Sequence, residues 1–562
     1  MKLLEVNNLS ISFDQNTVNS KVVDSVSFIL NKGETLGIVG ESGSGKSLTA
    51  MALLNLLPAN AMVTGDIFFY NPNQSINLLK LPGNDWLKFR GKSISMIFQE
   101  PMTSLNPTMK CGQQVSEILF IHTKLSSKNR YQAVLDLFNE VKLPDPKRIY
   151  NSYPHEISGG QKQRVMIAMA IALKPSILIA DEPTTALDVT VQKAIIELLK
   201  NIQEKYKISI IFISHDLGVI SQIADNVLVM YEGKIAEYGS VRTILNNPKN
   251  AYTQGLIKCR PDLNFKGKRL PVLSDFIQNQ KKPVSKTDQQ EQNAIFKDEK
   301  IILSVNQLNK NFLSKANFFG KSKDALKAVQ NISFNVYKGE TLGLVGESGC
   351  GKTTLGRIIA QLIDFNSGQI EYKEKALNNL SKKELSEFRK SVQIIFQDPY
   401  SSLNPKITVG DAIREPLEVY KLYKTSAERK QRVFELLDQV KLDHDTYYKY
   451  PHEFSGGQRQ RIVIARALAL NPEFLICDES VSALDVSVQA EILNLLNDLK
   501  RDYQLTYIFI SHDLSVVKYM SDRIMVMRDG ALVEINKAGE IYQSPASDYT
   551  KKLIDSIPRI SF

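Results

Sequence analysis

Two glycine-rich loops carry the residue types needed to hold phosphate groups. Residues 40–47 read GESGSGKS and residues 346–353 read GESGCGKT. Each loop follows a short apolar segment and precedes a segment with a helical pattern, which is the context this motif requires. Glycines let backbone N–H groups close around phosphate oxygens, and a helix N-terminus adds favourable partial charge. The predicted phosphate-binding residues are Gly40, Glu41, Ser42, Gly43, Ser44, Gly45, Lys46 and Ser47, and Gly346, Glu347, Ser348, Gly349, Cys350, Gly351, Lys352 and Thr353.

Acidic residues end two apolar segments downstream of these loops, in ILIADE (177–182) and FLICDE (474–479). Asp181 and Asp478 could complete a Mg²⁺ shell begun by the hydroxyls of Ser47 and Thr353. The next residues, Glu182 and Glu479, could orient or deprotonate an attacking water. An acidic pair after a strand can also simply cap a helix. The glycine-rich loop upstream in both cases favours the catalytic interpretation.

Two of the six histidines, His215 and His512, each follow an IFIS segment. A histidine there is often structural. Both recur where the carboxyl ends of parallel strands should meet, which is where a γ-phosphate would lie. The repetition therefore favours a phosphate contact for both.

The elements that must position these residues occur twice. Ser158 and Ser455 lie 297 positions apart, as do Asp181 and Asp478, whereas Lys46 and Lys352 lie 306 apart. This long period indicates a duplicated domain rather than a short-repeat solenoid. We predict domains at 1–258 and 301–562. The linker at 259–300 is polar in its second part, and its more apolar first part could pack on the first domain.

Within each half, short aliphatic runs such as LGIVG, ILIAD and IIFIS alternate with amphipathic segments such as VQKAIIELLKNIQ. Runs of four to six aliphatic residues are typical of buried parallel strands. The alternation predicts an α/β fold with helices on both faces of a parallel sheet.

Composition limits the classes of function. The chain has 562 residues, a formal net charge of +10, and no basic run interleaved with aromatic residues. This charge could indicate nucleic acid, an anionic membrane or nothing specific, and we expect no nucleic acid partner. Its four cysteines are far apart, which argues against zinc and against disulfides. No apolar run approaches the ~18 residues that span a bilayer, so we expect other chains to supply any channel.

The segments ISGGQ (157–161) and FSGGQ (454–458) resemble the signature of the ATP-binding cassette family. That family combines the glycine-rich loop, a Q-loop, this signature, an Asp-Glu strand end, a D-loop and a switch histidine, and both halves contain all six. The resemblance implies two tandem P-loop NTPase domains. Each would have a RecA-like parallel-sheet core, an antiparallel β subdomain and a helical subdomain.

The resemblance also implies ATP and Mg²⁺ as cofactors and assigns further roles. Glu182, Glu479, His215 and His512 become the catalytic set. The implied Mg²⁺ ligands are Ser47, Thr353, Gln99, Gln397, Asp181 and Asp478. Further ATP contacts are implied for Ser158, Gly159, Gly160, Gln161, Ser455, Gly456, Gly457, Gln458, Asp188 and Asp485. Phe13 and Phe312 are candidates for stacking on adenine, although either could be a core residue. In the family each signature serves the opposite domain, so Lys46 should share a site with Ser455, and Lys352 with Ser158.

Other segments resemble the peptide-importer branch, which includes nickel and glutathione systems. They are the SLNP motifs at 104–107 and 402–405, the YPHE motifs, and the tyrosine-threonine segments at 247–257 and 544–554. This resemblance implies two separate permease subunits, an extracytoplasmic binding protein and a peripheral location on the cytoplasmic face of the membrane. Only Cys259 lies after the first cassette, so we expect no iron–sulfur cluster. The alternatives are a soluble tandem ATPase of translation or DNA repair, and an exporter ATPase.

Overall fold

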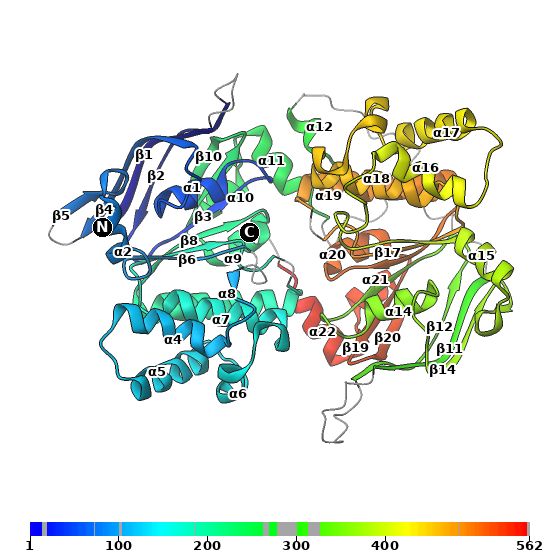
Figure 1. Ribbon diagram of the computed structural model, residues 1–562, viewed down its shortest axis with the longest axis horizontal. Helices are drawn as coiled ribbons and strands as arrows, with labels where there is room; N and C mark the ends of the chain where they lie inside the picture. Colours follow the sequence, from blue (N-terminus) through cyan, green and yellow to red (C-terminus); the bar gives the residue numbers. More distant parts are fainter. Residues whose placement is uncertain are drawn as a thin grey trace.

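The computed structural model describes residues 1–13, 20–71, 74–99, 104–185, 187–261, 269–277, 300–312, 326–482 and 484–558. The chain forms two halves that lie side by side, the first coloured blue to green and the second yellow-green to red (Figure 1). Most of the predicted linker, at 262–268 and 278–299, lies outside the described residues.

Each half is built on a six-stranded sheet that is parallel except for one edge pair. In the first half the strands run in the order β10 (Lys234–Ser240), β9 (Asn226–Tyr231), β3 (Thr35–Val39), β8 (Ser209–Ser214), β7 (Ile177–Asp181), β6 (Ile94–Ile97). In the second half the order is β16 (Val392–Ile395), β17 (Phe474–Asp478), β18 (Thr506–Ile510), β13 (Thr341–Val345), β19 (Arg523–Arg528), β20 (Ala531–Lys537). Among the described strands of these two six-stranded sheets, β9–β10 and β19–β20 are the antiparallel pairs. The central strands are fully buried, as their aliphatic sequences predict.

A four-stranded antiparallel sheet accompanies each core. The first contains β2 (Ser20–Asn31), β1 (Lys2–Phe13), β4 (Ala61–Asn71) and β5 (Gln74–Asn77). The second contains β12 (Leu326–Tyr337), β11 (Ile301–Phe312), β14 (Ser367–Tyr372) and β15 (Lys375–Ala376). Strand β4 has 11 residues against six in β14. Between the phosphate lysine and the glutamine the first half is eight residues longer than the second, since Lys46 and Gln99 lie 53 positions apart and Lys352 and Gln397 lie 45 apart. These extra residues fall largely in this hairpin.

A helical region follows β6 and β16. It contains α4 (Cys111–His122), α5 (Ser127–Glu140), α6 (Pro146–Asn151) and α7 (Gly159–Ile171), and in the second half α16 (Val409–Val419), α17 (Ser426–Gln439) and α18 (Gly456–Leu468). Side-chain caps begin several of these helices; Ser126, for example, accepts a hydrogen bond from the Asn129 amide. Together with the two sheets, this region confirms the predicted three-part α/β fold.

The remaining helices cover the core sheets or extend from them. In the first half they are α1 (Lys46–Leu53), α2 (Gly83–Phe89), α8 (Val189–Tyr206), α9 (Leu217–Ile223), α10 (Val241–Asn246) and α11 (Ala251–Lys258). In the second half they are α14 (Lys352–Ile359), α15 (Lys382–Ser391), α19 (Val486–Tyr503), α20 (Leu514–Met520), α21 (Ala538–Gln543) and α22 (Asp548–Asp555). None of the described helices is long and apolar enough to cross a bilayer.

The described part of the linker joins the halves. Helix α12 (Leu273–Ile277) packs on α11, as expected for a segment docked on the first domain. Leu270, however, is held by the second half, because its backbone N–H and C=O each form a 2.9 Å hydrogen bond with the Asn494 side chain. The prediction that this segment packs on the first domain is therefore only half right.

Candidate functional site

The functional loops meet at the carboxyl ends of the parallel strands. Between β3 and α1, Lys46 is 5% exposed and its Nζ donates to the carbonyl oxygens of Gly40 and Glu41 over 2.8 and 2.7 Å. In the second half, Lys352 donates to Gly346 and Glu347 over 2.7 and 2.9 Å. Both lysines thus fold over their own loops. Burial lowers the pKa of Lys46, and the nearby carboxylates, Glu182 foremost, oppose that shift.

A hydroxyl and a carboxylate meet beside each lysine. Ser47 Oγ donates to Asp181 Oδ1 over 3.1 Å, and Thr353 Oγ1 donates to Asp478 Oδ1 over 2.9 Å. Burial raises the pKa of Asp181 to about 6 against the opposing hydrogen bond from Ser47, and it raises the pKa of Asp478 as well. Hard oxygen donors of these two kinds are what Mg²⁺ prefers, so both pairs fit the predicted metal.

Three side chains of the first half converge on the carboxylate of Glu182. Glu182 Oε2 accepts hydrogen bonds from Gln99 Nε2 over 3.2 Å and from Thr185 Oγ1 over 2.8 Å, and it lies 3.3 Å from His215 Nδ1. Burial alone would raise the pKa of Glu182, but the hydrogen bond and charge of His215 outweigh it and lower that pKa to about 2. Burial alone would lower the pKa of His215, but the hydrogen bond and charge of Glu182 outweigh it and raise that pKa. Both shifts describe an ion pair.

The second half repeats this cluster. Gln397 Nε2 donates to Glu479 Oε2 over 2.7 Å, and His512 Nδ1 lies 3.6 Å from the same oxygen. The pKa of Glu479 is lowered because the hydrogen bond and charge of His512 outweigh the effect of burial. The structure therefore brings together each predicted glutamine, glutamate and histidine.

The signature turns begin helices. Ser158 Oγ accepts from the Gln161 amide at the start of α7, while Gln161 Oε1 accepts from the Ser158 amide over 3.2 Å. Ser455 and Gln458 form the same reciprocal cap on α18. This is a capping box, which leaves the turn rigid and its helix N-terminus defined.

Glycine in the signature allows close packing against the helix that follows the acidic strand. A Cβ on Gly457 would lie 2.3 Å from Val488 in α19, and one on Gly160 would lie 3.0 Å from Val191 in α8. Each signature helix is thereby fixed to the start of α8 or α19. Those two helix starts carry the D-loop residues.

Each glycine-rich loop touches the D-loop of the opposite half. Ser42 Oγ donates to Asp485 Oδ1 over 3.1 Å, and the Ser348 amide donates to Asp188 Oδ2 over 3.3 Å. The loops therefore face each other head to tail, the orientation that the predicted sites require. The direct pairing of Lys46 with Ser455, and of Lys352 with Ser158, stays a prediction.

Further residues at this interface were missed by the sequence analysis. Thr190 Oγ1 of the first half donates to Glu347 Oε1 of the second over 3.2 Å. Ser487 of the second half contacts Glu41 of the first. Thr190 and Ser487 each lie two residues after a D-loop aspartate. No feature of either type or spacing marks a small hydroxyl residue there as an interface contact.

Two tyrosines also support the loops. The Glu41 amide donates to Tyr252 Oη over 2.9 Å, and the Glu347 amide donates to Tyr549 Oη over 3.2 Å. Both tyrosines lie in the segments that recur 297 positions apart. That recurrence is the signal that could have assigned them to the site.

The aromatic candidates lie at the ends of the antiparallel strands. Phe13 is partly buried and packs against the core of its half, as the core alternative requires. Phe312 is 38% exposed, with Lys310 Nζ 5.1 Å from its ring centroid. Adenine stacking stays a prediction for both.

Two family profiles match this sequence. The profile described as ABC transporter matches residues 23–185 and 329–482. The chain belongs to the ABC transporter family. The second profile, described as the C-terminal region of oligopeptide/dipeptide transporters, matches residues 236–284 and 533–562. This second match includes the tyrosine segments and extends into the predicted linker.

Curated relatives match this sequence over nearly its whole length. The glutathione import ATP-binding protein GsiA of Salmonella choleraesuis (strain SC-B67) is 44% identical over 560 residues, which cover 99% of this chain and 89% of that protein. GsiA of Pectobacterium atrosepticum is 42% identical, covering 99% and 90%. A solved ATP-binding cassette, MJ0796 with ADP and phosphate, aligns over 42% of this chain and 98% of its own, with 28% identity and a TM-score of 0.38.

The two profiles and the GsiA relatives confirm the predicted class. The chain is an ATPase with two fused ABC cassettes that couples ATP hydrolysis to transport. They give no support to the alternative of a soluble ATPase in translation or DNA repair.

Proposed function

We propose that this ABC ATPase binds two Mg·ATP between its halves and uses their hydrolysis to drive import of small peptide-like molecules such as glutathione. The observation that carries the proposal is the repeated cluster of phosphate-loop lysine, hydroxyl–aspartate pair, glutamine, glutamate and histidine. Each cluster belongs to a loop that touches the opposite D-loop. ATP between such surfaces would hold them together, and hydrolysis would release them.

Different residues of each half bind the phosphates and the Mg²⁺ ion. Lys46 and Lys352 bind the β- and γ-phosphates. The Mg²⁺ ligands are Ser47, Asp181 and Gln99 in the first half and Thr353, Asp478 and Gln397 in the second. When bound, Mg²⁺ neutralises charge on the phosphate oxygens. The signature turn of the opposite half contributes backbone N–H groups to the γ-phosphate.

Glu182 and Glu479 position the attacking water. A carboxylate with a pKa of about 2 is a weak proton acceptor, so Glu182 in its paired state orients water better than it deprotonates it. If His215 turns to the γ-phosphate, Glu182 loses the partner that lowers its pKa. Burial then raises that pKa and makes the carboxylate a stronger base.

The relatives and the second profile support the proposed cargo and partners. The relatives are named for glutathione import, and the profile is that of oligopeptide and dipeptide transporters. We expect two permease subunits, a separate extracytoplasmic binding protein, and a peripheral position at the cytoplasmic face of the membrane. Exposed apolar residues near the ends of α4 and α16, Ile121 and Val419, offer corresponding contact points for the permeases.

The ATPase assignment is tested by removing the phosphate lysines. Lys46→Ala combined with Lys352→Ala should lower ATP turnover by roughly 10²-fold, because both sites then lack the phosphate lysine and no other side chain can replace the lost charge. Lys88→Ala, which changes an exposed lysine on α2, is the matched control and should keep the parent rate. A near-parental rate in the double variant would refute the proposal. The cargo is tested by measuring uptake of labelled glutathione or dipeptide by cells in which the gene is deleted. We expect that uptake to be lost.

A further inference from the structure

An arginine just after α11 reaches the loop that carries His215. Arg260 Nη1 donates to Asp216 Oδ1 over 2.8 Å, and the two side chains are only 13% and 20% exposed. Asp216 follows His215 directly and caps α9, because the same Oδ1 accepts from the Gly218 amide over 2.7 Å. Arg260 thus holds the group that fixes the backbone next to the histidine.

The glycine of this loop makes room for the arginine. A Cβ added to Gly218 would lie 1.9 Å from Arg260 Nη1, far inside van der Waals contact. Any residue other than glycine at 218 would therefore displace the guanidinium from Asp216. The ion pair and the glycine form one structural unit.

The second half lacks both members of this unit. The positions 297 residues after Arg260 and Gly218 are occupied by Ile557 and Ser515. Asp513 still caps α20 by accepting from the Ser515 amide over 2.8 Å. An aliphatic side chain stands where the first half has an arginine, and the space the arginine needs is filled by a Cβ.

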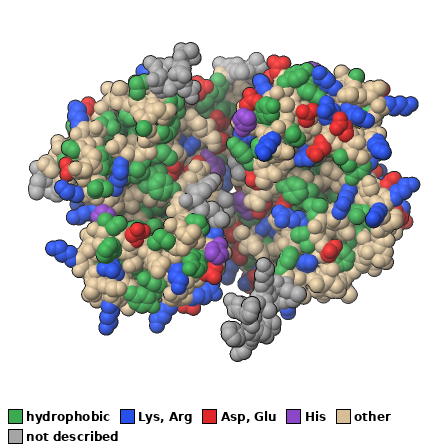
Figure 2. Space-filling model, in the orientation of Figure 1, with side chains coloured by type: hydrophobic (Ala, Val, Ile, Leu, Met, Phe, Trp, Pro, Cys, Tyr) green, Lys and Arg blue, Asp and Glu red, His purple; other side chains and the backbone are tan. Residues whose placement is uncertain are grey.

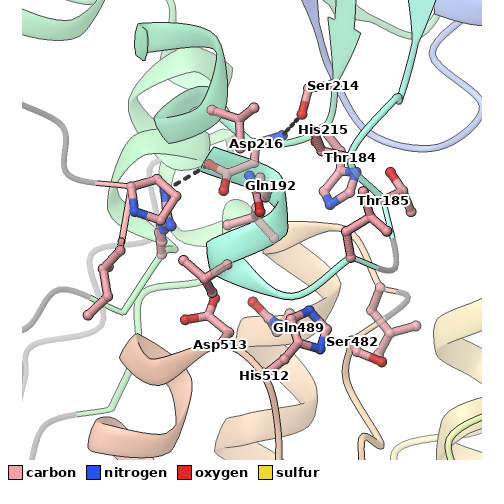
Figure 3. Close-up of a pocket in the computed structure, with 18 residues that line it drawn as sticks. Thr184, Thr185, Gln192, Ser214, His215, Asp216, Ser482, Gln489, His512 and Asp513 are labelled. Carbon is pink, nitrogen blue, oxygen red and sulfur yellow. Dashed lines mark hydrogen bonds and ion pairs between the residues drawn. The ribbon is translucent and has the colours of Figure 1, made fainter. Parts of the chain in front are cut away.

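The histidine loops of both halves face a single cavity between the halves. Figure 3 shows His215 and Asp216 on one side of it and His512 and Asp513 on the other, with Gln192 and Gln489 between. Arg260 and Ile557 also line this cavity. The two switch histidines therefore share this cavity, and among the described residues that line it an arginine, Arg260, supports the loop of the first histidine.

We propose that Arg260 is a positioning residue for the first ATP site, the site of Lys46, Glu182 and His215, and that it makes the two sites unequal. The inference rests on the proposed function, because Arg260 acts through His215. A charge-assisted, largely buried ion pair holds its partners more tightly than a neutral contact does. A preorganised histidine loop needs less rearrangement when the γ-phosphate arrives. The first site should therefore turn over faster than the second.

The test measures turnover at each site separately in the full chain. Parent protein is incubated with Mg²⁺, 8-azido-ATP and orthovanadate, irradiated, digested, and the label assigned to first-half or second-half peptides by mass spectrometry. Vanadate trapping requires hydrolysis, so it reports turnover, whereas labelling without vanadate reports binding. Arg260→Ala should lower trapped label at the first site by about tenfold, since small misplacements of reacting groups have effects of this order. Trapping at the second site, and binding at both, should stay unchanged.

Companion variants separate positioning from folding. Gly218→Ser should act like Arg260→Ala, because it displaces the arginine without removing it. Arg260→Lys should retain more trapping than Arg260→Ala, because the charge is kept. The controls Ser515→Gly, the reverse change in the second half, and Arg269→Ala, which removes an arginine paired with Asp498, should leave both sites unchanged.

Three results would overturn the inference. The first is an equal loss at both sites, or no loss at either, in Arg260→Ala. The second is a lysine variant as impaired as the alanine variant. The third, absence of trapping at both sites of the parent protein, would overturn the proposed function itself and the inference with it.

Discussion

At the scale of single residues, the two glutamates after the acidic strands hold an unusual backbone conformation. Glu182 and Glu479 have φ values of 45° and 48°, in the left-handed region that residues with a Cβ seldom adopt. Their amides donate to the carbonyls of Ile213 and Ile510 on the neighbouring strands, over 3.0 and 2.9 Å. Such a conformation persists only where the surroundings enforce it. It aims each carboxylate at the glutamine and histidine of its own half.

Removing the charge of both glutamates should separate binding from hydrolysis. We expect Glu182→Gln with Glu479→Gln to bind ATP normally and to hydrolyse it at least roughly 10²-fold more slowly, since the amide cannot accept a proton. Turnover is measured by phosphate release, and binding with a fluorescent nucleotide. Glu204→Gln, on the exposed face of α8, is the control. Hydrolysis at the parent rate in the double variant would exclude a catalytic role.

The pairing of Glu182 with His215 predicts a pH-dependent contribution to stability. Glu182 has a lowered pKa, so its contribution is present above the ordinary value of 4.5 and is lost as pH falls towards about 2. His215 has a raised pKa, so its contribution is complete below the ordinary value of 6.5 and is lost as pH rises through the raised one. The pair should therefore stabilise the fold most between these two ordinary values.

Thermal unfolding checks this window. The difference in Tm between the parent and His215→Ala should be larger at about pH 5.5 than at about pH 9, because the contribution of the raised pKa of His215 declines as pH rises. His122→Ala, at the exposed end of α4, should show no such trend. A difference that does not change with pH would contradict the assigned pairing.

At the scale of elements, α11 and α22 support the glycine-rich loops. Each loop lies between its own strand and helix. In addition, Tyr252 of α11 and Tyr549 of α22 accept hydrogen bonds from the loop amides of Glu41 and Glu347. The same helices reach the opposite half. Figure 1 shows α11 beside α19, and Lys193 of α8 donates to the Asp555 carbonyl at the end of α22. These helices thus connect loop geometry with the contact between halves.

Deleting one hydroxyl tests this support. Tyr252→Phe leaves the Glu41 amide without its acceptor and should weaken ATP binding at the first site by about 1 kcal/mol, the usual net value of one such hydrogen bond. Affinity is measured by titration with a fluorescent ATP analogue. Tyr238→Phe, which changes a half-exposed tyrosine on β10, should bind as the parent does. Parental affinity in Tyr252→Phe would show that the loop is set without α11.

At the scale of the whole molecule, titratable groups gather where the halves meet. Figure 2 shows histidine side chains along the seam, while lysines, arginines and acidic residues are mixed over the visible outer face. Glu41 of the first glycine-rich loop faces Asp485 and Glu491 of the second half. Burial, and then repulsion from these two carboxylates, raises the pKa of Glu41 to about 7. Protonation of Glu41 would remove this repulsion across the contact between the halves.

We expect closure of the nucleotide-free protein to strengthen as pH falls through about 7. A carboxyl whose pKa is raised in the closed form binds its proton more readily there, so protonation favours closure and deprotonation opposes it. Fluorescence transfer between dyes placed on the two halves reports the distance. Glu41→Gln should abolish the pH dependence, whereas Glu347→Gln, at the matching position of the other loop, should retain it. Equal pH dependence in Glu41→Gln and the parent would contradict the prediction.

Sequence alone determined the parts of this protein that local pattern encodes. Short aliphatic runs specify buried parallel strands, and the spacing of Gly40, Lys46 and Ser47 specifies a phosphate loop. The 297-residue repeat identified two copies of one site, with Gln99, Glu182 and His215 in the first. These features follow from residues close in the chain, or from two copies compared with each other.

Tertiary structure decided what depends on residues far apart in the chain. The docking of Leu270 on α19 and the reach of Arg260 to Asp216 join segments whose individual patterns give no sign of contact. The recurrence of Tyr252 marked it as part of the site, but only the fold shows that it supports Glu41. The duplication also hid a difference, because matching motifs made the two sites look alike. Only packing in three dimensions shows that Arg260 and Gly218 form a unit that Ile557 and Ser515 cannot form.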